Sequence, residues 1–158
     1  MDAPSTASTP DAMRIEVLGA GSWGTALATL LARNGHSVRL LGRRADDLAA
    51  FATTHENARY LPGFALPDAL EFGRIEEAGK ADLHVVAVPS SAVRSVCLEI
   101  REVCEVAVLA AKGLESGTGL LVSEAASASL STDRIGALSG PNLATEIARG
   151  IPTAAISA

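Results

Sequence analysis

The stretch RIEVLGAGSWGTALATLLARNG, residues 14–35, restricts the fold of this chain more than any other part of the sequence. A short stretch with β-branched residues at 14–18, predicted to be a strand, leads straight into three glycines spaced as GxGxxG. Apolar residues then recur at helical spacing until Gly35, a residue type common just past helix ends, and a second predicted strand follows at 37–41. Strand, glycine turn, helix and strand within about thirty residues form a βαβ unit, which predicts a parallel sheet.

The three glycines of this turn are suited to binding phosphate groups. Gly19 permits the tight turn, Gly21 lets a pyrophosphate approach the backbone, and Gly24 lets the helix pack closely on the strand. Ser22 and Trp23 begin the helix, so their backbone N–H groups and the positive end of the helix dipole face an anion there. A GxGxxG motif alone is weak evidence, but its position between strand and helix predicts a dinucleotide-binding site. The alternative is a set of glycines that only shapes a turn.

The rest of the chain alternates between predicted strands and helices. Near-continuous apolar runs at 83–88 and 106–111 are typical of parallel strands covered on both faces, and a helical pattern that includes Cys97 and Cys104 lies between them. We further expect helices over 46–52, 119–130 and 142–149, strands over 135–138 and 153–156, and a structured loop over 55–67. These elements predict an α/β fold with a doubly wound, mainly parallel sheet of the Rossmann type.

Composition narrows the possible functions. A chain of 158 residues suits one domain, here residues 13–158, after a Ser-, Thr- and Pro-rich tail at 1–12 that we expect to be disordered. A net charge of −5 argues against a nucleic-acid partner. Cys97 and Cys104 fit no zinc-ligand spacing, so we expect core residues and no metal site. We recognise no signal peptide and no apolar run of membrane-spanning length, which predicts a cytoplasmic protein without membrane insertion.

The end of the second strand indicates which dinucleotide would bind. At this place an Asp or Glu would accept a hydrogen bond from the ribose 2′-hydroxyl of NAD, whereas an Arg accommodates the 2′-phosphate of NADP. The sequence has Arg43 and Arg44, whose guanidinium groups can bind phosphate in a bidentate way. We therefore favour NADP while keeping NAD open, the alternative being a solvated basic pair in a loop. Asp46 and Asp47 fit the first turn of the next helix.

Polar clusters follow three of the later strands, at the edge where ligands bind in such sheets. They are PSS at 89–91, KGLE at 112–115 and SGPN at 139–142. Lys112 either binds an anionic or hydroxyl-bearing substrate beside the nicotinamide, or is a surface lysine whose stem packs along the protein. The SGPN turn offers backbone N–H groups at a helix N-terminus, either for a small anion or simply as a helix cap.

Five segments in order carry a family resemblance: GAGSWGTALA, HENARYLPG, AVPSSAVR, AAKGLESGTG and SGPNLATEIARGIPTA. They resemble the N-terminal domain of bacterial-type NAD(P)-dependent glycerol-3-phosphate dehydrogenases, over residues 13–158. KGLE and SGPN at these places are not shared by general Rossmann domains. The resemblance implies an oxidoreductase that transfers hydride reversibly between NAD(P)H and dihydroxyacetone phosphate, giving sn-glycerol 3-phosphate for phospholipid synthesis.

The resemblance also assigns site residues. It places Ser22, Trp23, Arg43, Arg44 and Ala144 on the cofactor, Gly140 and Asn142 on the substrate, and Lys112 on both. Position 142 is often Ser or Thr in the family, so an amide replaces a hydroxyl here. Thr145 stands where the family often has a basic residue.

The family has a helical second domain, which supplies the proton-transfer lysine and most ligands of the substrate phosphate. Nothing in these 158 residues matches it, so we assign no catalytic residue, and His36, His55 and His84 have structural interpretations. We expect this chain alone to be inactive or weakly active, with an apolar face open to a helical domain or to homo-oligomer formation. Two alternatives are a different two-domain hydroxyacid or ketopantoate-type reductase, and an NAD(P)-sensing module without chemistry. KGLE and SGPN disfavour both.

Overall fold

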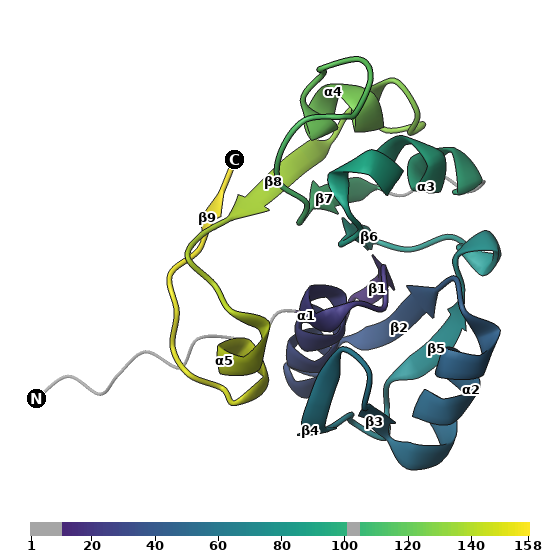
Figure 1. The fold of residues 1–158 in the computed structure, drawn as a ribbon, viewed down its shortest axis with the longest axis vertical. Helices are drawn as coiled ribbons and strands as arrows, with labels where there is room; N and C mark the ends of the chain where they lie inside the picture. Colours follow the sequence, from purple (N-terminus) through teal and green to yellow (C-terminus); the bar gives the residue numbers. More distant parts are fainter. Residues whose placement is uncertain (1–10, 101–104) are drawn as a thin grey trace, which may run out of the picture.

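A twisted, mostly parallel sheet forms the centre of the molecule (Figure 1). The computed structural model describes residues 11–100 and 105–158. Within this part, strand β1 (Arg14–Leu18) pairs in parallel with β2 (Ser37–Gly42) on one side and β6 (Leu83–Val86) on the other. The full order is β5-β2-β1-β6-β7-β8-β9, and only β9 runs antiparallel to its neighbour. Its parallel strands follow the order of dinucleotide-binding folds, which confirms the predicted fold class.

The remaining elements complete this sheet and its helical layers. The other strands are β5 (Glu71–Arg74), β7 (Val106–Leu109), β8 (Ile135–Ser139) and β9 (Ile156–Ser157), and β3 (Glu56–Asn57) pairs with β4 (Leu61–Ala65) in a separate hairpin. The helices are α1 (Ser22–Arg33), α2 (Ala45–Thr54), α3 (Val93–Glu99), α4 (Val122–Ser127) and α5 (Ala144–Ala148), with 3₁₀ turns η1 (Ile75–Glu77) and η2 (Ser90–Ala92).

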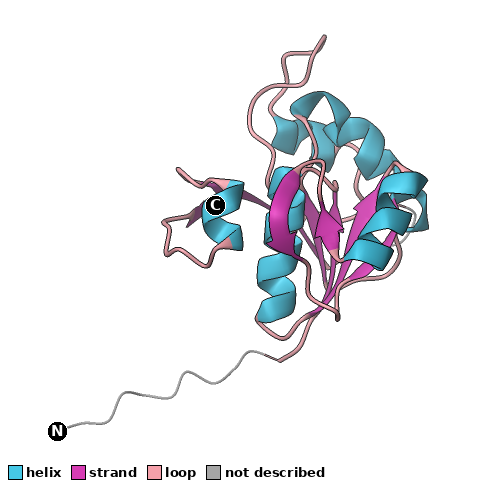
Figure 2. Ribbon diagram, turned by 60° about the horizontal axis from the view of Figure 1, so that its bottom comes forward, coloured by secondary structure: helices cyan, strands magenta, loops and turns pink. Residues whose placement is uncertain are grey.

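Helices cover both faces of the sheet (Figure 2). Because neighbouring residues of a strand point to opposite faces, β1 contributes to two hydrophobic clusters. Val17 belongs to the cluster that contains Leu27 of α1 and Phe51 of α2, and Leu18 belongs to the cluster that contains α3 residues such as Val96. The core is mostly aliphatic, in line with an aromatic content of only 3%. The βαβ unit expected at 14–41 is confirmed, with Gly35 directly after the helix C-cap at positive φ.

Four expected elements differ from the observed ones. Residues 55–67 contain the β3–β4 hairpin, and the strand expected at 153–156 forms only at Ile156–Ser157, as the antiparallel edge strand β9. Helices α4 and α5 are shorter than the expected 119–130 and 142–149. Strand β5 was not expected at all, because EFGR has only one buried position and shows no alternation of apolar residues. Cys97 is buried in α3 as expected, whereas Cys104 and residues 1–10 lie outside the described residues.

A buried ionic group lies in the central strand. The carboxylate of Glu16 accepts a 2.6 Å hydrogen bond from Arg39, lies 3.0 Å from Nε2 of His84 and accepts the backbone N–H of Gly79. Burial opposes ionisation of Glu16, but the hydrogen bonds with His84 and Gly79 outweigh it and keep the pKa of Glu16 below its ordinary value. His84 is therefore part of the sheet's internal bonding, in agreement with the structural interpretation of this residue.

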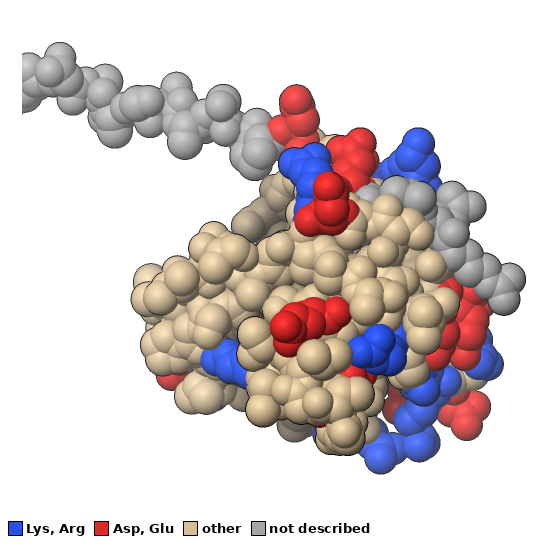
Figure 3. Space-filling view, turned by 90° about the horizontal axis from the view of Figure 1, so that it is seen from above, with Lys and Arg blue, Asp and Glu red and all other residues tan. Residues whose placement is uncertain are grey.

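Charged side chains are unevenly spread over the surface. Seen from above, the left side, formed by the C-terminal segment, is mostly uncharged, and charged groups gather on the right (Figure 3). Leu143, Ile151 and Ile156 of that segment are exposed large hydrophobic residues. None of the described helices has the length and apolar character that crossing a membrane requires.

Candidate functional site

The glycine turn after β1 has a backbone that only glycine fits at two positions. Gly19 has φ +120°, and a Cβ added to it would lie 2.4 Å from the carbonyl oxygen of Ala87. A Cβ at Gly24 would lie 1.8 Å from the carbonyl oxygen of Gly19. These contacts let the first turn of α1 pack directly against the ends of β1 and β6, as predicted for close helix–strand packing.

Gly21 differs from the other two glycines because its open side faces away from the protein. A Cβ at this position would meet nothing within 4 Å. Gly21 is also the N-cap of α1, makes no side-chain cap hydrogen bond, and is followed by a first turn without acidic residues. The free N–H groups at the start of α1 and the positive end of its dipole are therefore available to an anion beside Gly21.

A first cleft of about 390 Å³ opens on one side of this turn, at the carboxyl ends of β1, β2 and β6. Its lining includes Gly19, Gly21, Gly42, Arg43, Arg44 and Asp47. Arg43 and Arg44 thus lie at the sheet edge where the motif spacing predicts contact with the 2′ position of a dinucleotide's ribose.

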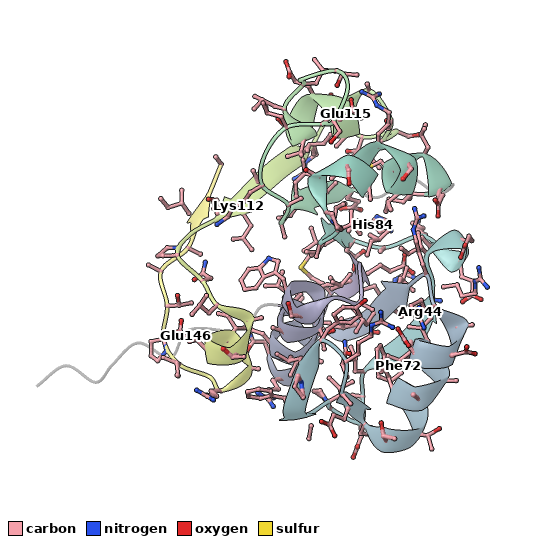
Figure 4. All side chains as sticks on the ribbon, in the orientation of Figure 1. Arg44, Phe72, His84, Lys112, Glu115 and Glu146 are labelled. Atoms are coloured by element: carbon pink, nitrogen blue, oxygen red, sulfur yellow. The ribbon has the colours of Figure 1, made fainter. Side chains whose placement is uncertain are left out.

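Each arginine of the first cleft has a carboxylate partner. Nη2 of Arg43 lies 3.0 Å from Oε1 of Glu99 in α3, and Nε of Arg44 lies 2.9 Å from Oδ2 of Asp47 (Arg44 in Figure 4). Asp46 and Asp47 occupy the first turn of α2 as expected, but Asp47 also faces the cleft. The two arginines therefore give this end of the cleft much less net positive charge than the sequence suggests.

A second cleft of about 300 Å³ opens on the other side of the glycine turn. It is lined by Ser22, Trp23, Lys112, Gly140, Asn142 and Ala144, among others. These residues come from the start of α1, the segment after β7, the segment after β8 and the start of α5. The residues that the family resemblance assigned to the substrate thus lie beside three that it assigned to the cofactor alone, Ser22, Trp23 and Ala144.

Hydrogen bonds within the second cleft fix the SGPN segment. Nζ of Lys112 donates to the carbonyl oxygen of Gly140 at 2.8 Å, which joins the ends of β7 and β8 (Lys112 in Figure 4). Asn142 does not cap α5, because the N-cap residue is Leu143 and the Asn142 Oδ1 atom accepts a hydrogen bond from Thr153. The helix-cap alternative for this turn is therefore wrong.

Asn57 is a site residue that the sequence analysis missed. It is fully buried in the hairpin, and its Nδ2 donates to the carbonyl oxygen of Ala20 at 3.0 Å and to Oγ1 of Thr25 at 2.8 Å. The segment HENARYLPG is thereby fastened to the glycine turn. Asn57 lies within HENARYLPG, one of the segments that carry the family resemblance, and this position indicates that it matters. The sequence does not reveal that its side chain bonds to Ala20 and Thr25.

Glu115 has a structural role in the KGLE segment. Its carboxylate accepts hydrogen bonds from Nε and Nη2 of Arg94 at 2.6 and 2.9 Å, and from Oγ1 of Thr118 at 2.6 Å. The hydrogen bonds from Arg94 and Thr118 lower the pKa of Glu115 to about 2. The loop that follows Lys112 is thus held against α3.

In the described parts of the chain, no group of three or more His, Cys, Asp or Glu side chains is placed to hold a metal ion.

Comparison with known proteins agrees with this geometry. The family model for the N-terminus of NAD-dependent glycerol-3-phosphate dehydrogenase matches residues 14–158. Glycerol-3-phosphate dehydrogenase [NAD(P)+] from Xanthomonas oryzae pv. oryzae is 44% identical over 147 residues, covering 89% of this chain and 43% of the relative. The Corynebacterium glutamicum enzyme of the same name is 41% identical, covering 91% and 46%.

A solved structure shows the same likeness. The crystal structure of glycerol-3-phosphate dehydrogenase from Coxiella burnetii has a TM-score of 0.80 and 34% identity, over 91% of this chain and 46% of that chain. The chain described here spans less than half the length of these relatives. By the match across nearly all of its residues, it belongs to the family of NAD-dependent glycerol-3-phosphate dehydrogenase N-terminal domains.

Proposed function

We propose that this chain forms the cofactor-binding half of a glycerol-3-phosphate dehydrogenase, which transfers hydride between NAD(P)H and dihydroxyacetone phosphate. The observation that carries the proposal is the meeting of distant motifs at one sheet edge. The glycine turn, the arginine pair, the KGLE lysine and the SGPN segment line two clefts that adjoin at the start of α1. Family membership and the NAD(P) named in the relatives' descriptions support the same activity.

The residues present fit a dinucleotide. The pyrophosphate would lie against Gly21, where no protein atom occupies the open side, and would accept hydrogen bonds from the N–H groups of Ser22 and Trp23. The adenosine end would occupy the first cleft beside Arg43 and Arg44. The nicotinamide end would occupy the second cleft.

Lys112 is the residue best placed to bind substrate. Its ammonium group, exposed and bonded to the Gly140 carbonyl, would donate a hydrogen bond to a substrate oxygen, with the Asn142 amide adding a second contact. The bound reduced nicotinamide supplies the hydride. Lys112 would hold the carbonyl oxygen of dihydroxyacetone phosphate and so favour negative charge that develops on it. No described residue is assigned the proton transfer, so the full reaction draws on groups beyond those named here.

Substitution of Gly21 tests the nucleotide site with little effect on the fold. Gly21 has φ −77° and a Cβ there would meet nothing within 4 Å, so Gly21→Val should lower the free energy of unfolding by no more than about 1 kcal/mol, the scale of a poor N-cap residue. The valine side chain would fill the space for the pyrophosphate, and NADPH affinity should fall at least about tenfold. Energy transfer from Trp23, the single tryptophan, to the reduced nicotinamide measures binding.

Gly79→Val is the matched control, because a Cβ at Gly79 also meets only one atom, at 4.0 Å, and Gly79 lies at the opposite edge of the sheet. It should leave NADPH binding unchanged. Equal losses of NADPH affinity in both variants would contradict the proposed site.

Steady-state assays with dihydroxyacetone phosphate then separate binding from turnover, and we expect these 158 residues alone to bind NADPH but to turn over slowly or not at all. Activity recovered by adding the helical half of a relative would distinguish an enzyme half from a nucleotide-sensing module.

A further inference from the structure

The end of β2 is tightly packed at Gly42, close to where many NAD sites have an acidic residue. Gly42 is the last residue of β2, and a Cβ added to it would lie 3.1 Å from the Cβ of Ala20 and 3.2 Å from Cδ2 of Leu48. Both neighbours belong to packed segments, the glycine turn and the buried face of α2. A side chain at Gly42 would push these neighbours apart, and the next two positions are arginines, so the end of β2 itself brings no carboxylate to the ribose.

Asp47 brings a carboxylate to this place from the first turn of α2. It lines the first cleft, and its side chain is 21% exposed, against 58% for its partner Arg44. The ion pair joins Oδ2 of Asp47 to Nε of Arg44 at 2.9 Å, so an acid and a base lie side by side at the cleft end. The neighbouring Asp46 is exposed and does not line the cleft, although it carries the same charge in the same helical turn.

We infer that Asp47 is a specificity-determining residue for the two nicotinamide dinucleotides, an inference that rests on the nucleotide binding proposed above. Its carboxylate accepts a hydrogen bond from the ribose 2′-hydroxyl of NADH. The same carboxylate repels the 2′-phosphate of NADPH, which carries close to two negative charges, and competes with that phosphate for the guanidinium of Arg44. Asp47 thereby reduces the preference for NADPH that Arg43 and Arg44 alone would give.

The experiment compares Asp47→Asn with Asp46→Asn in the full chain. Dissociation constants for NADH and NADPH are measured by Trp23 fluorescence at low salt, where charge effects between exposed groups are least screened. For Asp47→Asn we expect NADPH to bind about three- to tenfold more tightly, from loss of the repulsion. NADH should bind about two- to fivefold more weakly, because a neutral amide is a poorer acceptor than a carboxylate. Asp46→Asn, which removes the same charge from the helix start, should change the ratio of the two constants less than about twofold.

The outcomes separate the inference from the proposed function. If the unchanged chain binds neither nucleotide, both are overturned. If it binds them and Asp47→Asn changes the ratio no more than Asp46→Asn does, the inference alone is wrong. A parallel loss of affinity for both nucleotides in Asp47→Asn also overturns it, because a merely structural role would weaken both alike. Unfolding midpoints of the two variants, which should agree with each other, check that the fold is intact.

Discussion

At the scale of single residues, the amide of Asn57 connects the hairpin to the turn that faces the nucleotide. Its two donated hydrogen bonds, to Ala20 and Thr25, and its oxygen, which accepts the backbone N–H of Tyr60, leave no polar atom of this buried side chain without a partner. Such a satisfied buried group fixes the geometry of its surroundings, because each lost partner leaves a desolvated polar atom. Asn57 thus determines where the turn lies.

We predict that Asn57→Leu destabilises the chain and weakens the binding of NADH and NADPH equally. The leucine removes the hydrogen-bond partner of the buried Oγ1 of Thr25 and of the part-buried Ala20 carbonyl, which should lower the free energy of unfolding by about 1–3 kcal/mol for each group left unsatisfied. Urea unfolding measures this loss, and titration with NADH and NADPH measures binding. A variant with unchanged stability, or one that loses affinity for only one nucleotide, would show that Asn57 does not position the turn.

The arginine pair shows why single residues are hard to interpret from sequence. Arg43 and Arg44 do lie in the cleft where the motif spacing predicts them. The partner of Arg43 could not be foreseen, because Glu99 is 56 residues away in the chain. Asp47 lies only three residues after Arg44, so that pair is local, but a spacing alone does not show that both side chains face the cleft. The identity of the site residues was therefore predictable from local pattern, whereas the net charge around them was not. The preference for NADP stays a prediction for this reason.

At the scale of elements, the loop between β7 and α4 depends on one ion pair. Arg94 of α3 and Glu115 form two hydrogen bonds, and Thr118 closes the loop on the same carboxylate. Lys112, three residues before Glu115, is thereby held at the mouth of the second cleft. The glutamate of KGLE acts through the loop rather than on a ligand.

We predict that this ion pair makes stability depend on pH in a defined acid range. The pKa of Glu115 is about 2 in the folded chain against an ordinary value of 4.5, so its ionised form stabilises the fold fully above about pH 4.5. That contribution is lost as the pH falls from about 4.5 towards 2. Glu115→Gln should have a lower unfolding midpoint than the unchanged chain at pH 7, and the difference should shrink to a small fraction of its pH 7 value by pH 2.

Thermal unfolding from pH 7 to pH 2 measures the difference directly. Arg94→Met removes the other partner of the same ion pair. Glu115→Gln should therefore cost less stability in the Arg94→Met background than in the unchanged chain, because only the hydrogen bond from Thr118 is then left to lose. A difference between the chain and Glu115→Gln that stays constant down to pH 2 would mean that Glu115 does not provide the effect.

The strands also show which secondary-structure elements could be predicted from the sequence. The bounds of β1 match the expected 14–18, because its β-branched residues lead directly into the glycine turn, although the strand also carries the buried carboxylate of Glu16. Edge strands β5 and β9 are short and partly or wholly exposed, so they lack that pattern and were missed or misplaced. The hairpin at β3–β4 depends on Asn57 and on packing against α1, neither of which periodicity encodes.

At the scale of the whole molecule, the glycine turn lies where the two halves of the sheet meet. Strand β1 joins the β2–β5 side to the β6–β8 side, and the two hydrophobic clusters lie on opposite faces of it. A ligand at this turn contacts both halves. We therefore predict that NADPH stabilises the described domain as one unit, with its free energy of unfolding raised by about 2.7 kcal/mol at a concentration 100 times its dissociation constant.

Calorimetry in the presence and absence of NADPH checks this prediction. A single transition that moves to higher temperature as NADPH is added agrees with it. Two separate transitions, of which only one responds to NADPH, would indicate that the two sides of the sheet unfold independently. Gly21→Val provides the control, because a tenfold weaker affinity leaves only about 1.4 kcal/mol of stabilisation at the same NADPH concentration, so its transition should move about half as far or less.

The first and second clefts are separated only by the glycine turn, so synthetic ligands for this edge of the sheet can be built from two parts. A mononucleotide small enough for one hollow leaves the other accessible, so fragments for each side can be selected separately. Joined by a short anionic linker across the amides of Ser22 and Trp23, two weak fragments would gain affinity through their high effective concentration. The linker length is then set by the width of the turn rather than by either fragment.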